Sequence, residues 1–112
     1  GCDEGRIDDL LEEVGLAADA HRPILEFSAG MKRRLGMARL LLASPKLALF
    51  DEPFGQLDPQ GVSLVEEIID RLRNQGCTVV MSTHDIERGL SLADERMHLE
   101  QGRLESWETL RA

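Results

Sequence analysis

The sequence predicts an α/β fold built on two parallel strands that are joined by a helix. Two short apolar runs, residues 47–50 and 78–81, have the length and composition of strands buried on both faces of a sheet. Between them, the segment from Pro59 to Gly76 carries apolar side chains at helical spacing. A strand, a helix and a second strand in this order form a parallel unit with a right-handed crossover. The carboxyl ends of both strands are therefore expected at the same edge of the sheet.

Two more helices are predicted before the first strand. Apolar residues recur at i, i+3, i+4 and i+7 over about residues 6–14, which favours an amphipathic helix. Residues 16–27 are expected to be irregular because a proline interrupts any helix there. Ser28 then precedes a helix over about residues 29–43. We assign the apolar face of this helix to Met31, Leu35, Ala38 and Leu42.

The helix between the strands has clear signals at both ends. Asp58 and Pro59 have the pattern of an N-cap followed by a first-turn proline, and Gly76 marks the other end. Its apolar face is expected to consist of Leu64, Val65, Ile68, Ile69 and Leu72.

The last part of the chain predicts smaller elements. Asp85 is expected to cap a short helix that runs to about Leu92. Residues 96–99 and 103–106 flank a Gln-Gly pair, which is typical of a hairpin. A final helical turn is expected over residues 107–111, with a packing role for its tryptophan.

Composition limits the function classes. The chain has 112 residues, enough for one small domain, and its 42% apolar and 30% charged content is typical of a soluble globular protein. The net charge of −8 argues against a nucleic-acid surface, which is usually basic. No apolar run approaches the roughly 20 residues of a membrane span.

The two cysteines and the first residue give minor indications. Cys77 opens an apolar run and is expected to be a small buried side chain, whereas Cys2 lies at the chain end. A disulfide or a metal pair is the alternative, and the low cysteine content fits a reducing cytoplasm. The chain begins with Gly1 rather than methionine, which suggests a fragment.

Two neighbouring acids, Asp51 and Glu52, follow the first strand directly. In open α/β sheets, ligands bind at the carboxyl ends of the strands. A carboxylate there can hold a hard cation or accept a proton. We therefore expect Asp51 to face a metal ion and Glu52 to orient an attacking water. The alternative is a pair of solvated acids at the start of a loop.

His84 follows the second strand, after Ser82 and Thr83. Its expected position beside the acids would let its imidazole hydrogen-bond a terminal phosphate. His21 and His98 have no comparable setting, and we expect them to be structural or exposed.

The segment Ser28, Ala29 and Gly30 begins the second helix. Small residues at a helix N-terminus expose backbone N–H groups and the positive end of the helix dipole to an anion. Simple capping by Ser28 is the alternative, and the spacing alone does not decide between the two. Asp58 begins the next helix, and capping alone would account for it as well.

A phosphate-binding loop of the form G-x-x-x-x-G-K-[ST] does not occur in this sequence. The chain has two lysines, Lys32 and Lys46, and neither lies in such a loop. The metal and water side of a phosphoryl-transfer site is thus predicted without the loop that holds the phosphates.

In this combination the chain resembles the ATP-binding subunits of ABC transporters. Residues 27–31, Phe-Ser-Ala-Gly-Met, look like the family signature, usually LSGGQ. Residues 47–52 look like the Walker B strand with its catalytic acid. Residues 56–58 resemble the D-loop, and residues 82–85 resemble the switch-histidine region. All four occur in the family's order and at similar intervals.

The resemblance implies the C-terminal half of a P-loop NTPase-type, RecA-like parallel sheet, preceded by part of the family's α-helical subdomain. Residues of about 1–44 would then be the helical subdomain with the signature, and residues of about 45–112 the later part of the α/β core.

The resemblance also implies a role for each residue that matches a motif. Asp51 would help to hold Mg²⁺, and Glu52 would polarise the attacking water. His84 would contact the γ-phosphate of ATP. Residues 28–30 would touch the ATP held by a partner subunit, and Asp58 would communicate across that dimer interface.

The chain departs from the family pattern at a few positions. Ala29 stands where a second glycine is usual, Met31 replaces glutamine, and Gln56 lies where a small residue is common. The added methyl of Ala29 is a small change that leaves anion binding intact, whereas loss of the glutamine would alter ribose or interface contacts. The signature with the residues 32–35 that follow it, and the Asp-Glu-Pro-Phe segment, are similar to those of haem-exporter ATPases of cytochrome c maturation and of other simple export ATPases.

The resemblance implies ATP binding and hydrolysis that power transport across a membrane. The expected partners are a second ATP-binding subunit and a transmembrane permease, with no nucleic acid. The expected location is cytoplasmic and peripheral, on the inner face of the cell membrane. A nucleic-acid-associated ATPase of the same kind and a non-catalytic fragment are the alternatives. Without the phosphate-binding loop, we expect the chain to be inactive alone.

Overall fold

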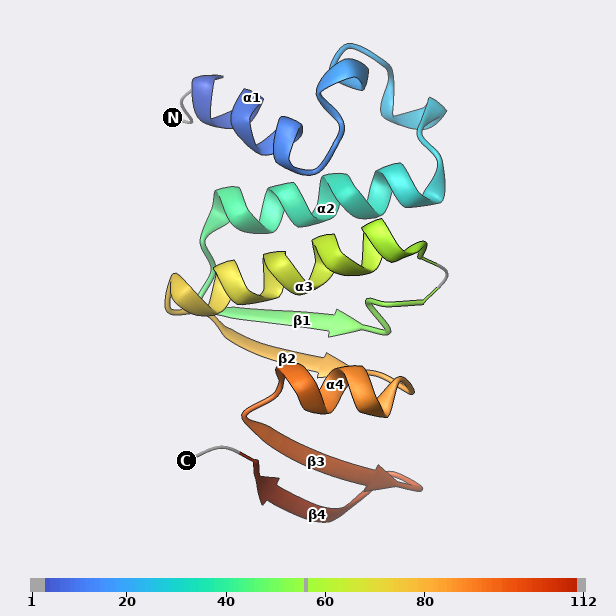
Figure 1. Cartoon of the computed structure of the whole chain (residues 1–112), viewed down its shortest axis with the longest axis vertical. Helices are drawn as coiled ribbons and strands as arrows, with labels where there is room; N and C mark the ends of the chain where they lie inside the picture. The colour runs from blue at the N-terminus through green and yellow to red at the C-terminus, as the bar shows by residue number, and fades with distance from the viewer. Residues whose placement is uncertain (1–3, 56, 111–112) are drawn as a thin grey trace.

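The computed structural model describes residues 4–55 and 57–110, and Figure 1 shows their elements along the long axis, with α1 toward one end and the β3–β4 hairpin at the other. The helices are α1 (Glu4–Glu13), α2 (Ala29–Ala43), α3 (Pro59–Asn74) and α4 (Ile86–Leu92), with short 3-10 turns at Ala17–Asp19 and Ile24–Glu26. The strands are β1 (Leu47–Asp51), β2 (Thr78–Ser82), β3 (Glu95–Glu100) and β4 (Arg103–Thr109). The predicted helices before the first strand and the predicted strand–helix–strand unit are confirmed.

Strands β1 and β2 pair in parallel, with Leu47 opposite Thr78 and Asp51 opposite Ser82. Helix α3 connects them, and in Figure 1 it lies alongside β1. The carboxyl ends of both strands therefore meet at one edge, as the sequence predicts.

The expectation that these strands are buried on both faces is wrong. Side chains alternate along β1, so that Ala48 is buried while Leu47 and Leu49 are 55% and 71% exposed. Strand β2 alternates in the same way, and its Val80 is exposed. Within residues 4–55 and 57–110 the core cluster takes side chains from only one face of this sheet. No described side chains form an apolar layer that would exclude water from the other face.

A hydrophobic core of described residues joins the early helices to the strands. Helix α2 lies between α1 and α3 (Figure 1), so its buried residues face two neighbours. This explains why Met37 and Leu41 are buried although the predicted apolar face contained only Ala38 of the buried set. Cys77 is buried, as expected, whereas Cys2 lies outside the described residues. The core residues are Leu10, Val14, Leu16, Met37, Ala38, Leu41, Ala48, Phe54, Val65, Ile68, Ile69, Leu72 and Cys77.

Polar side chains cap three helices at the predicted positions. The Ser28 hydroxyl accepts a hydrogen bond from the N–H of Met31 at 3.1 Å. One carboxylate oxygen of Asp58 accepts from the N–H of Gly61 at 2.7 Å. Asp85 caps α4 in the same manner. These bonds satisfy N–H groups that have no partner inside their helix and so define where each helix begins.

Strands β3 and β4 form an antiparallel hairpin, and Met97 pairs with Trp107. Gln101 and Gly102 form the connection with φ values of 49° and 75°, the left-handed conformation that a tight two-residue hairpin loop requires. The predicted helical turn over residues 107–111 is wrong where the structure describes it, because the chain continues in β4 to Thr109. Trp107 is 59% exposed rather than packed, and its indole N–H donates to Glu95 at 3.1 Å.

No helix within the described part of the chain combines the length and the hydropathy that a membrane crossing requires.

Candidate functional site

The first acid lies at the carboxyl edge of the sheet and contacts the neighbouring strand. The Ser82 hydroxyl donates a hydrogen bond to a carboxylate oxygen of Asp51 at 2.6 Å. The N–H of Glu52 donates to the Ser82 carbonyl at 2.8 Å, which extends the strand pairing by one residue. The side chains of Asp51 and Ser82 are both exposed, so an incoming ligand can reach them.

The second acid lies beside the predicted histidine. Nε2 of His84 is 3.4 Å from a carboxylate oxygen of Glu52. The His84 side chain is 98% exposed, and that of Glu52 is 39% exposed. The structure thus brings together three of the predicted residues, Asp51, Glu52 and His84, at one open edge.

The backbone at Glu52 is in the left-handed region, with φ of 47°. This conformation costs a residue other than glycine about 1–2 kcal/mol. Strain of this kind is found at functional sites more often than elsewhere. Side chains alternate between the two faces of a strand, and the turn at Glu52 ends this alternation. The Glu52 side chain therefore does not point where the next residue of a continuing strand would point.

The turn that follows Glu52 is held in place by the helix α2. The N–H of Gly55 donates to the Glu52 carbonyl at 3.2 Å, and Pro53 and Phe54 are buried beneath it. The Arg33 guanidinium donates to the Gly55 carbonyl at 2.6 Å. A residue just after the signature-like segment therefore contacts the turn that carries the second acid.

The segment around His84 is packed closely on α4. The Thr83 hydroxyl accepts a hydrogen bond from the N–H of Asp85 at 3.0 Å. A Cβ atom on Gly89 would lie 2.9 Å from the Thr83 methyl group, closer than such atoms approach. A glycine is needed there for α4 to lie against the residue that precedes His84.

The remaining predicted residues lie elsewhere. Ser28, Ala29 and Gly30 are exposed at the N-terminus of α2, and Asp58 is exposed at the N-terminus of α3. Across the two described ranges, no hydrogen bond or ion pair joins any of them to the acids. Of the D-loop-like segment, Gln56 lies outside the described residues.

Two arginines near the site were not predicted to contribute. Arg33 belongs to a short basic run, residues 32–34, that lies in none of the four motifs described above. Arg88 contacts the residues around both Glu52 and His84. Its spacing of three residues from the cap Asp85 was the only local signal, because its other partners are distant in sequence.

The residues present fit a magnesium ion bound together with a phosphate ligand. Asp51 and Ser82 offer carboxylate and hydroxyl oxygens, the hard ligands that this ion prefers. Among the described residues, no group of three or more acids, histidines or cysteines could hold a metal alone. Magnesium is usually bound by one or two carboxylates, water and substrate phosphates rather than by a complete protein cage.

Comparison with known proteins gives consistent matches. The family model described as ABC transporter matches residues 3–55. The lantibiotic transport ATP-binding protein SrtF of Streptococcus pyogenes is 44% identical over 94 residues, which are 84% of this chain and 41% of that protein. An energy-coupling factor transporter ATP-binding protein, EcfA2 of Methanospirillum hungatei, is 36% identical over 88% of this chain and 25% of its own length.

Solved structures of ABC transporter subunits are also similar to this chain. A structure of an ATP binding subunit of an ABC transporter superposes with a TM-score of 0.86 at 28% identity, over 98% of this chain and 48% of that one. The structure of cbiO1 from Clostridium perfringens, part of the ABC transporter complex cbiONQ, superposes with a TM-score of 0.73 at 29% identity, over 96% and 43%. The chain spans less than half the length of each of these relatives.

The parallel α/β arrangement and the structural neighbours show that the chain has part of the P-loop NTPase fold. The family match and the relatives show that the chain is similar to the ATP-binding domains of ABC transporters.

Proposed function

We propose that this chain supplies the metal and water side of an ATP-hydrolysing site that powers transport across a membrane. The observation that carries the proposal is the contact of Glu52 with His84, next to the Asp51–Ser82 hydrogen bond. A base for water, a phosphate contact and a metal ligand are the groups that phosphoryl transfer needs at this edge.

Each residue has a separate role in this proposal. Asp51 holds Mg²⁺, which when bound neutralises charge on the phosphates of ATP. Glu52 accepts a hydrogen bond from the attacking water and orients it toward the γ-phosphate. His84 donates a hydrogen bond to the γ-phosphate from its exposed side chain. The distance of 3.4 Å between His84 and Glu52 supports their acting on one phosphate and its water.

The signature-like segment serves a different site. Ser28, Ala29 and Gly30 are exposed and make no contact with Asp51 or Glu52, which supports a role toward ATP bound by a second subunit. The N-terminus of α2 would present N–H groups and a positive dipole end to that anion. Asp58 would lie at the same subunit interface. A domain of this kind therefore acts as a dimer, with a transmembrane permease as its further partner, at the cytoplasmic face of the membrane.

The relatives are named for lantibiotic transport and for energy-coupling factor transport, which are different activities of those proteins. The similarity to haem exporters rests on two short segments and stays a prediction.

The test measures ATP hydrolysis by a fusion protein, called the joined domain below. It consists of a segment with a G-x-x-x-x-G-K-[ST] loop, taken from a homologous domain and joined to Gly1 of this chain. We expect Mg²⁺-dependent turnover that stops when EDTA removes the metal and that neither DNA nor RNA stimulates. A joined domain that binds ATP but does not turn it over would contradict the proposal. Turnover that requires DNA or RNA would support the nucleic-acid-associated alternative instead.

A further inference from the structure

Arg88 on α4 joins three segments that surround the proposed site. One guanidinium nitrogen is 2.6 Å from a carboxylate oxygen of Glu66 on α3. Its Nε donates to Asp85, the cap of α4, at 3.2 Å. The guanidinium also lies over the ring of Phe54, 5.6 Å from the ring centre. The partners Glu66 and Phe54 come from parts of the chain that precede the second strand.

These contacts hold the charged guanidinium of Arg88 in one orientation. The hydrogen bonds to Glu66 and then to Asp85 raise the pKa of Arg88 above its ordinary value. A planar guanidinium has five N–H donors in a fixed fork, so it can bond two carboxylates while its face lies over an aromatic ring. The arginine is therefore matched to all three partners.

Two of the three partners of Arg88 lie within two residues, in sequence, of the site residues that contact one another. Phe54 is two residues after Glu52, and Asp85 directly follows His84. Through the side chains of Phe54 and Asp85, Arg88 thus links the segment that follows Glu52 to the segment that follows His84. The third partner, Glu66, lies on α3, which packs in the core. Its ion pair therefore holds the Arg88 side chain against a well-packed helix.

We propose that Arg88 is a positioning residue, which sets the distance between the water-orienting acid and the phosphate-binding histidine. The inference rests on the proposed ATPase function and assigns to that site a residue outside its motifs. Arg88 itself touches neither ATP nor water in this proposal. Its loss should change the rate of the chemical step more than the binding of ATP, because small misplacements of reacting groups lower rates strongly.

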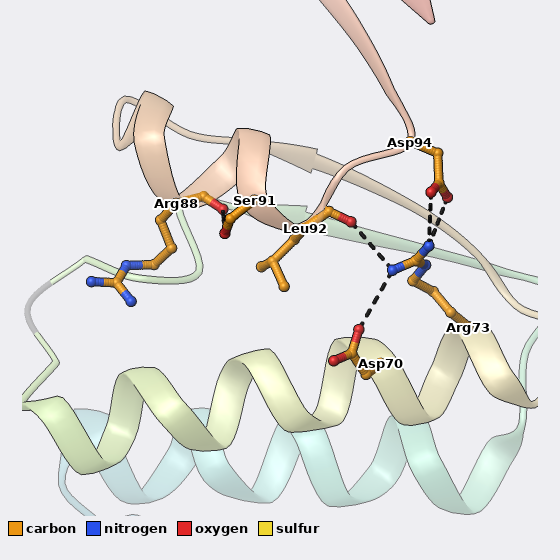
Figure 2. Close-up of polar contacts among 6 residues, drawn as sticks. All are labelled: Asp70, Arg73, Arg88, Ser91, Leu92 and Asp94. Atoms are coloured by element: carbon orange, nitrogen blue, oxygen red, sulfur yellow. Dashed lines mark hydrogen bonds and ion pairs between the residues drawn. The ribbon is translucent and has the colours of Figure 1, made fainter. Parts of the chain in front are cut away.

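Arg73 provides a matched control on the same side of the molecule. Figure 2 shows its side chain directed toward Asp94, with the Arg88 side chain extending away from that cluster. Arg73 donates to both carboxylate oxygens of Asp94, at 2.8 and 2.9 Å, and to the Leu92 carbonyl at 3.2 Å. The two arginines are similarly exposed, 32% for Arg73 and 38% for Arg88. Only Arg88 contacts residues next to Glu52 and His84.

The kinetic test compares variants of the joined domain. Arg88→Met should lower kcat for ATP by about 10- to 100-fold while KM changes little. Glu66→Gln should lower kcat in the same direction, and the double variant should be no slower than Arg88→Met, because both remove one interaction. Arg73→Met should lower stability without lowering kcat. If Arg88→Met keeps the kcat of the unchanged domain, or if Arg73→Met lowers kcat equally, the proposal is overturned.

A second test uses the chain alone and needs no ATP hydrolysis. In NMR spectra, Arg88→Met should shift the signals of the His84 ring and of the Glu52 amide, and Arg73→Met should leave both in place. Unshifted signals in a folded Arg88→Met chain would overturn the positioning role. Absence of turnover in the unchanged joined domain would instead contradict the ATPase function, so the two failures are distinguishable. If Arg88→Met does not fold, Glu66→Gln replaces it in both tests.

Discussion

Replacement of Glu52 by glutamine is expected to lower ATP hydrolysis by the joined domain about 10²- to 10⁴-fold, the usual scale for a general base. Glutamine has nearly the same shape, so the turn after β1 and the neighbouring His84 should stay in place. It cannot accept a proton from water as a carboxylate does. ATP binding should persist, because Glu52 acts on the water rather than on the nucleotide. Steady-state phosphate release and titration with a fluorescent ATP analogue measure the two effects separately.

Glu87→Gln is the control for this prediction. Glu87 is an exposed acid on α4, so its replacement makes the same change of charge outside the proposed site. We expect Glu87→Gln to retain full turnover. Equal rates for the unchanged domain and Glu52→Gln would remove Glu52 from the role of base.

Replacement of Leu72 by alanine is expected to lower the free energy of unfolding by about 2–5 kcal/mol. The Leu72 side chain is fully buried near the end of α3, within the core that joins the helices to the sheet. Its truncation removes apolar contacts and leaves a cavity that the surrounding helices close only in part. Urea denaturation of the chain, followed by circular dichroism, measures the change.

Leu25→Ala is the matched control for the core substitution. The same side chain is truncated at a position that is 92% exposed, and the free energy of unfolding should change by less than about 0.5 kcal/mol. If the two variants have the same urea midpoint, Leu72 does not belong to a cooperative core.

Local patterns predicted most of the backbone. Asp58 followed by Pro59, and Ser28 before a run of small residues, define helix starts through bonds within one turn. The two apolar runs separated by an amphipathic segment were enough to predict parallel strands with Asp51 and His84 at the same edge. These features depend on neighbours in sequence, which is why they could be inferred without a structure.

Features that depend on distant segments could not be predicted. An apolar run such as Leu47 to Phe50 does not reveal how many layers cover the strand, and here one face is open. Trp107 follows a strand-forming segment, and its pairing with Met97 overrode the predicted helical turn. Arg33 and Arg88 each contact a partner 22 residues away, so their roles emerge only from the folded chain.

The measurement that tests the central claim most directly is ATP turnover by the chain alone, beside the joined domain under the same conditions. Asp51, Glu52 and His84 are proposed to form the metal and water side of an ATP site whose phosphate-binding loop does not occur in these 112 residues. The chain alone should therefore release no more phosphate than its own Glu52→Gln variant, while the joined domain turns over ATP. Turnover by the chain alone that Glu52→Gln abolishes would contradict the claim that the site needs this loop.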